Sequence, residues 1–101
     1  MATTTKTLFR GAATTTVGTT LYTVPASTTT VVTSIVITNT AGTSSTFTLG
    51  LAGTNLATTV TVGAYDTTVL DLKQVLVATN TITGGAAAVT VNFHIAGVEI
   101  V

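Results

Sequence analysis

The side chains of this chain that could carry out catalysis or bind a metal are few. His94 is the only histidine, and the acidic residues are Asp66, Asp71 and Glu99. A metal site needs several His, Cys or carboxylate ligands that converge, and these four residues stand at no recognisable ligand spacing. The chain has no cysteine, which removes thiolate catalysis and disulfides. The sequence therefore predicts no metal site, with His94 a solvated or interface residue.

Patterns typical of other enzyme classes are also weak. No serine sits in a Gly-x-Ser-x-Gly elbow, so no serine nucleophile is indicated. Asp66 and Asp71 would be a candidate glycosidase pair, but Asp66 follows Tyr65 at a turn, where a bond from side chain to backbone is more common. No glycine-rich phosphate loop is present. We expect a protein that is not an enzyme and needs no cofactor.

Tyr22 and Tyr65 are the two tyrosines, and they leave two interpretations open. An exposed tyrosine is typical of protein interfaces and sugar-binding sites. In a short β-sandwich, a tyrosine more often packs in the core with its hydroxyl at the rim. We favour the second interpretation for both residues.

Charge and composition exclude several partners. Six of the 101 residues are charged and the formal net charge is zero. Nucleic-acid binding normally needs clustered Lys and Arg, so DNA and RNA are not expected partners. The longest apolar run, 31–37, is interrupted by Thr33 and Ser34 and is far shorter than a membrane-spanning helix. The first residues resemble no secretion signal, so we expect synthesis in a cytosol.

The β-branched residues predict strands. The chain has 29 Thr, 14 Val and 5 Ile, and this length allows one domain. Apolar and polar residues alternate over 88–96 and 46–51, with shorter runs at 21–24, 59–62 and 69–72. Turn residues mark breaks at 25–27, 40–43, 52–55, 63–64 and 84–85. The segment 71–78 could be a helical turn, although Val75 and Val77 favour a strand. These patterns predict an all-β fold, an antiparallel sandwich of about seven or eight short strands.

Two segments depart from simple alternation. In 29–39, Val31, Ile35 and Ile37 lie on one expected face while Val32 and Val36 lie on the other. We expect a neighbouring subunit to cover the second face, the alternative being that Val32 or Val36 is simply exposed.

Residues 1–18 show no sustained period and are predicted to be an N-terminal arm preceding a single sandwich domain at 19–101. Its Leu8, Phe9 and Arg10 are expected to dock on this subunit or the next. The candidate interface with another subunit or a capsid is therefore Leu8, Phe9, Arg10, Val32 and Val36.

Three stretches carry a family resemblance: LYTVPA at 21–26, VTSIVITNT at 32–40 and VTVNFHIAGVEIV at 89–101. Together they resemble small β-sandwich virion proteins of tailed bacteriophages, over about residues 17–101. The resemblance implies a jelly-roll-like sandwich and a non-enzymatic structural protein that is often trimeric. It implies no catalytic or ligand residues. The domain type occurs in head decoration (cement) proteins and in tail-associated proteins, and the length without fibre repeats favours decoration.

The leading hypothesis is a capsid decoration protein on the outer surface of the virion. It would form a homotrimer and stabilise the shell by bridging major capsid subunits, since a ligand of the assembled lattice favours assembly by mass action. The alternative is a tail-associated or adhesion module that binds host-surface carbohydrate. Ice binding, suggested by the threonine content, is disfavoured because the Thr-x-Thr pairs have no constant spacing.

Overall fold

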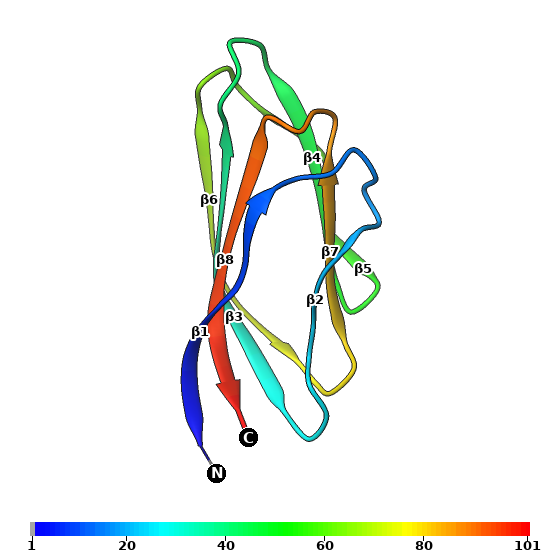
Figure 1. The fold of residues 1–101 in the computed structure, drawn as a ribbon, viewed down its shortest axis with the longest axis vertical. Helices are drawn as coiled ribbons and strands as arrows, with labels where there is room; N and C mark the ends of the chain where they lie inside the picture. The colour runs from blue at the N-terminus through cyan, green and yellow to red at the C-terminus, as the bar shows by residue number, and fades with distance from the viewer. Residues whose placement is uncertain (1) are drawn as a thin grey trace.

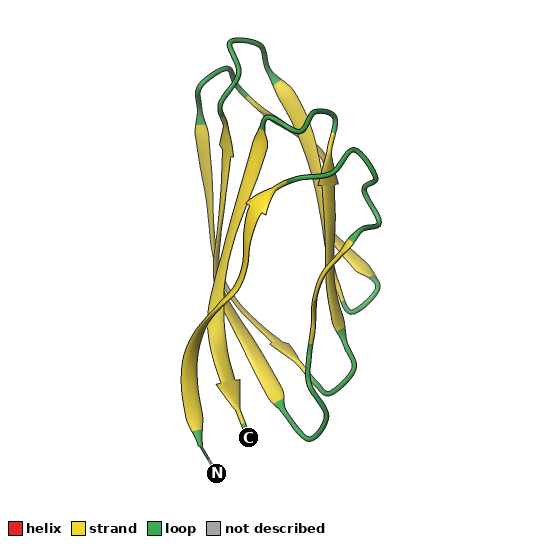
Figure 2. Ribbon diagram, in the orientation of Figure 1, coloured by secondary structure: helices red, strands yellow, loops and turns green. Residues whose placement is uncertain are grey.

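The strands form two four-stranded antiparallel sheets that face each other (Figures 1 and 2). The structure is a computed structural model and describes residues 2–101. Sheet A has the order β1-β8-β3-β6, and sheet B has the order β2-β7-β4-β5. The strands are β1 (Thr3–Ala12), β2 (Thr20–Thr23), β3 (Thr29–Asn39), β4 (Ser45–Leu51), β5 (Thr54–Val62), β6 (Thr67–Leu76), β7 (Thr81–Ala86) and β8 (Val91–Ile100).

The prediction of an all-β fold with two antiparallel sheets is confirmed. The segment 71–78, for which a helical turn was an open alternative, continues β6 to Leu76. No helix long and apolar enough to cross a membrane occurs among residues 2–101.

The core lies between the sheets and is built from alternate residues of their strands. Phe47 of β4 and Phe93 of β8 meet edge to face, with ring centroids 6.4 Å apart. Where a strand is regular, it contributes every second side chain, because successive side chains point to opposite faces. The most deeply buried aliphatic residues around this pair are Val32, Ile35, Ile37, Leu49, Ile82 and Val91.

Strand β3 carries a bulge that the alternation alone did not reveal. Its register against β8 shifts between Val32 and Ser34, which leaves Thr33 as an extra residue. A one-residue bulge moves the following side chains to the other face. Val32 therefore points into the core together with Ile35, and its side chain is 0% exposed. The placement of Val32 on an outer face with Val36 is wrong, and so is the placement of Val31 on the inner face with Ile35 and Ile37. The change of phase exchanges the two valines, so that the outer face of β3 carries Val31 and Val36.

The segment predicted as an N-terminal arm contains a strand of sheet A. Residues Thr3–Ala12 form β1, which is hydrogen-bonded to β8 along its length. The register shifts between Thr7 and Phe9, so that Leu8 is a bulged residue and packs in the core at 7% exposure. This bulge explains why the sequence showed no sustained period here. Of the two docking alternatives for the arm, the structure shows contact with its own subunit, and residue 18 falls in the loop that follows β1.

The glycine pair 84–85 lies inside β7, so the predicted strand end there is wrong. A Cβ at Gly84 would lie 2.6 Å from Leu49 Cδ2, and a Cβ at Gly85 would lie 2.5 Å from the Thr16 carbonyl oxygen. The glycines therefore mark close approach rather than a turn. By contrast, the break predicted at 52–55 contains the two-residue turn between β4 and β5, where Ala52 and Gly53 have φ of 52° and 80°.

Four connections gather at one end of the molecule, which we call the loop end, and both termini lie at the opposite end (Figure 1). Asn39, 0% exposed at the end of β3, joins three of these connections. Its Nδ2 donates to the carbonyls of Thr43 (2.7 Å) and Gly63 (3.2 Å). Its Oδ1 accepts from the Thr90 hydroxyl at 3.3 Å. One buried amide thus ties the β3–β4, β5–β6 and β7–β8 loops together.

Candidate functional site

The residues that could have formed a metal site lie apart. His94 stands on the outer face of β8, between Val36 of β3 and Arg10 of β1 in the register. Asp66 lies in the β5–β6 loop, where its Oδ1 accepts from the Thr67 backbone N–H at 2.8 Å, as the turn chemistry predicted. Across residues 2–101, no three His, Asp or Glu side chains gather as metal ligands would.

Glu99 is the centre of a polar cluster at the end that carries the termini. The Tyr22 hydroxyl donates to the Glu99 carboxylate and lies 3.0 Å from the Thr30 hydroxyl. Lys6 Nζ lies 3.3 Å from Glu99 Oε2. Because Tyr22 belongs to β2, and the other three residues belong to β3, β8 and β1, this Glu99 cluster links sheet B to sheet A.

The cluster shifts two pKa values in opposite directions. The hydrogen bond from Tyr22, followed by the bond and charge of Lys6, lowers the pKa of Glu99 below its ordinary value. Burial, followed by the bond to Glu99, raises the pKa of Tyr22. Both shifts favour a charged Glu99 beside a neutral Tyr22. The cluster is an inter-sheet contact, and Tyr22 has the partly buried body and rim hydroxyl that the sequence favoured.

The outer face of sheet A carries two rows of valines. In one row Val69 of β6 pairs with Val36 of β3. In the other, Val31 of β3 lies between Val75 of β6 and Val98 of β8. Val69 and Val75 are 63% and 62% exposed, and the other three are half-buried. We call these five residues the outer valine face; such a surface is typical of protein contacts.

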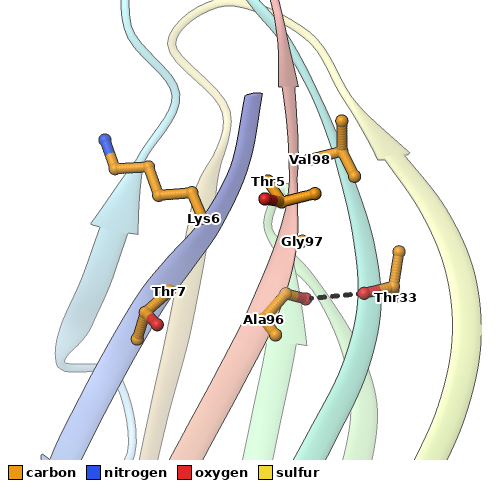
Figure 3. Close-up of a pocket in the computed structure, with 7 residues that line it drawn as sticks. All are labelled: Thr5, Lys6, Thr7, Thr33, Ala96, Gly97 and Val98. Carbon is orange, nitrogen blue, oxygen red and sulfur yellow. Dashed lines mark hydrogen bonds between the residues drawn. The ribbon is translucent and has the colours of Figure 1, made fainter. Parts of the chain in front are cut away.

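A hollow of about 540 Å³ adjoins the outer valine face (Figure 3). It lies along β8 between β1 and β3, at the level of the two bulges. Its lining residues are Thr5, Lys6, Thr7, Thr33, Ala96, Gly97 and Val98. The Lys6 side chain extends away from the other six residues in Figure 3, and its amine is held by Glu99. The Thr33 hydroxyl donates to the Ala96 carbonyl at 3.2 Å, so the bulge itself shapes this surface.

The structure divides the five predicted interface residues into two groups. Leu8 and Val32 are buried in the core, and Phe9 packs against it. Buried side chains are unavailable to a partner, so the structure contradicts the choice of Leu8 and Val32. Arg10 is exposed on β1, and Val36 belongs to the outer valine face.

The remaining members of the outer valine face were missed by sequence reasoning. Val69 and Val75 alternate with the inward Leu70 and Leu72, which is a signal available in the sequence. That signal gained meaning only once β6 was placed beside β3, because a row of valines across a sheet depends on which strands are neighbours.

The loop end exposes three further apolar side chains, on three different connections. They are Tyr65 (77% exposed), Val89 and Val17. Tyr65 lies in the β5–β6 loop, and a Cβ at Gly42 of the β3–β4 loop would lie 3.2 Å from its hydroxyl. The interpretation of Tyr65 as a core residue is therefore wrong, since its ring stands on the surface.

No family model matches the chain, and no curated protein is significantly similar to it.

Proposed function

We propose that the chain is a non-enzymatic structural protein of a tailed bacteriophage virion. In this proposal it decorates the outer capsid surface, bridges neighbouring major capsid subunits and stabilises the shell. It acts as a homo-oligomer, for which the family resemblance implies a trimer. It binds neither nucleic acid nor membrane and needs no cofactor.

The order of the strands supports a jelly-roll assignment. Sheet A reads β1-β8-β3-β6 and sheet B reads β2-β7-β4-β5, so each sheet alternates between the two halves of the chain. An eight-stranded double sheet of two Greek keys is the architecture of jelly rolls, which include viral capsid and lectin domains. Because fold alone does not determine function, this order supports the virion class without choosing a role within it.

The outer valine face is the single observation that carries the decoration role. Its five valines lie across three adjacent strands, beside a hollow whose seven lining residues include three threonines. Burying an exposed valine is worth about 1.5 kcal/mol or more, so a few such side chains give useful affinity without charge. A protein that binds an assembled lattice more tightly than free subunits stabilises that lattice. Binding through this face would also depend little on salt, since it rests on apolar contact.

Capsid binding tests the proposal directly. Heads of the phage that encodes the chain, prepared without it, are mixed with purified chain and sedimented, and their thermal stability is measured. We expect saturable binding, and a shell that withstands higher temperature when occupied. A chain that never co-sediments with heads would overturn the decoration role.

A matched pair of variants locates the contact. Val69→Asp on the outer valine face and Val89→Asp at the loop end change the same residue type at 63% and 62% exposure. We expect Val69→Asp to reduce capsid affinity at least tenfold, because it places a charge in an apolar contact, and Val89→Asp to leave it unchanged. The reverse result would assign binding to the loop end.

The alternative, a tail-associated module that binds host carbohydrate, has one supporting observation. Tyr65 presents an exposed ring at the loop end beside the β3–β4 loop, and aromatic rings are common in sugar sites. Detection of the chain in purified tails and loss of cell adhesion in a Tyr65→Ala variant would favour this function. Tyr65→Ala is expected to be silent if decoration is the role.

A further inference from the structure

Strand β6 is an edge of sheet A with an open side. Within residues 2–101 its only strand neighbour is β3, which leaves the backbone groups along its other side without a strand partner. It runs for ten residues, from Thr67 to Leu76. A long edge strand is a template for pairing with another chain unless charge, proline or irregularity blocks it. The chemistry along β6 therefore decides which partner fits.

The side chains of β6 match a second copy of the same strand. If two copies run antiparallel about a two-fold axis at Leu72, Asp71 faces Lys73 of the second copy, and Lys73 faces its Asp71. In the same register Val69 faces Val75, twice. Opposite charges and apolar side chains in directly opposed positions are the pairs that stabilise antiparallel strands. One axis thus satisfies four cross-strand pairs.

The two charges of β6 are available for this pairing. The one salt bridge in the described part of the chain is formed by Lys6 and Glu99, so Asp71 and Lys73 have no ionic partner within the molecule. Both are exposed. They are two of only six charged residues in the chain, and both fall at positions that oppose each other in this register.

The other three edge strands offer no equivalent match. Strand β1 carries Lys6 and Arg10, so two copies centred on Leu8 would oppose like charges. Strand β2 has four residues. Strand β5 has no charged residue, and Thr59 interrupts it with a φ of 49°. Complementarity to itself distinguishes β6 among the four edges.

We propose that two copies of this chain associate through β6, antiparallel and about a two-fold axis at Leu72. The contact joins the two A sheets into one sheet of eight strands. Residues directly opposed in an antiparallel pair lie on the same face, so the two outer valine faces become one continuous surface. The register shift of β6 against β3, between Asp71 and Gln74, lies at the proposed axis, so the two-fold places the irregular parts of the two edges opposite each other. The contact needs no capsid, and it holds whether or not the chain decorates one. It makes the homo-oligomer a two-fold dimer, in place of the trimer that the family resemblance implies.

Charge exchange tests the register in solution. Light scattering after size exclusion and sedimentation equilibrium are applied to the wild type, Asp71→Lys, Lys73→Asp and the double variant. We expect the wild type to dimerise, and each single variant to dimerise at least about tenfold more weakly, because like charges then oppose each other twice. An equimolar mixture of the single variants, and the double variant, should restore association.

Arg10→Glu, on the opposite edge of sheet A, is the matched control and should dimerise like the wild type. Circular dichroism and the melting temperature establish that every variant is folded, as expected for exposed positions. A wild type that stays monomeric at about 1 mM, a closed trimer, or single variants that associate like the wild type would each overturn the proposal.

The absence of cysteine allows a second test. In a Val69→Cys/Val75→Cys variant, the proposed register places each new thiol opposite its counterpart in the other copy, within reach of a disulfide. We expect a covalent dimer under mild oxidation. The Val69→Cys/Val77→Cys variant, whose thiols are offset by two residues, should remain uncrosslinked. Equal crosslinking of both variants, or none in the first, would overturn the register.

Discussion

The two outer faces of this sandwich differ in one respect that the composition conceals. Sheet A presents the outer valine face, whereas the outward positions of sheet B are mainly threonine, at Thr46, Thr48, Thr61, Thr81 and Thr83. Valine and threonine have similar shapes and similar β propensity, so both suit a strand equally well. They differ in whether water satisfies the side chain. Residues of one shape therefore make two different surfaces. The threonine face of sheet B is satisfied by water, whereas the valine face of sheet A is stabilised when a partner covers it.

The largest effect is expected where both faces depend on the same core. Phe93→Ala removes one ring of the edge-to-face pair and should lower the free energy of unfolding by about 3–5 kcal/mol. His94→Ala, one residue along β8 on the outer face, should change it by about 0.5 kcal/mol or less. Urea unfolding monitored by circular dichroism measures both. Similar losses for the two variants would contradict the assignment of inner and outer sides.

The second-largest loss of stability is expected at Asn39, and it tests whether the two sheets unfold as one unit. Asn39→Ala leaves several loop carbonyls without a donor and should cost about 2–3 kcal/mol. Because these loops connect β3 and β6 of sheet A to β4 and β5 of sheet B, we expect a single transition at lower denaturant. Two separate transitions would show that the faces belong to independently stable sheets.

Exchanging valine and threonine between the outer faces of the two sheets should change binding by smaller amounts. Threonine at Val36 and Val69 should weaken capsid binding by about 1 kcal/mol per site, since each replaces a methyl group by a hydroxyl that prefers water. Valine at Thr46 and Thr61 should create an apolar patch on sheet B and a new association that rises with concentration. Co-sedimentation and light scattering measure the two outcomes. If neither exchange has an effect, the contrast between the faces has no functional meaning.

The smallest effect is expected from the Glu99 cluster. The lowered pKa of Glu99 means that folding favours its charged carboxylate. The resulting stabilisation of the folded state is present above the ordinary value of 4.5 and disappears as pH falls through the lowered value. The raised pKa of Tyr22 acts in the opposite direction: its contribution holds below the ordinary value of 10.0 and disappears above it. Melting temperatures of the wild type and Glu99→Gln, measured from pH 2 upward, test the acid limb. Equal slopes for both proteins would rule out Glu99 as its source.

The sequence predicted the strands better than the arrangement of those strands. Regular alternation located β4 within one residue and most of β8, because their side chains keep one phase throughout. It failed at Leu8 and Thr33, where a bulge in β1 and a bulge in β3 change the phase on either side of β8. A bulge is set by the pairing of neighbouring strands and has no dependable local signature. The outer valine face was missed for a related reason, since its rows exist only once β6, β3 and β8 are placed side by side.

The position of the termini has a mechanical consequence. Ala2 and Val101 are hydrogen-bonded to each other, N–H to carbonyl in both directions at 2.9 and 3.1 Å, at the open end of the β1–β8 pair. Tension applied through the two ends would load these bonds one after another, as in opening a zipper, instead of shearing the whole ladder at once. The chain should therefore yield at low force when pulled by its ends. Peeling should slow at Leu8, where the bulged side chain anchors β1 in the core and the next step requires that anchor to leave.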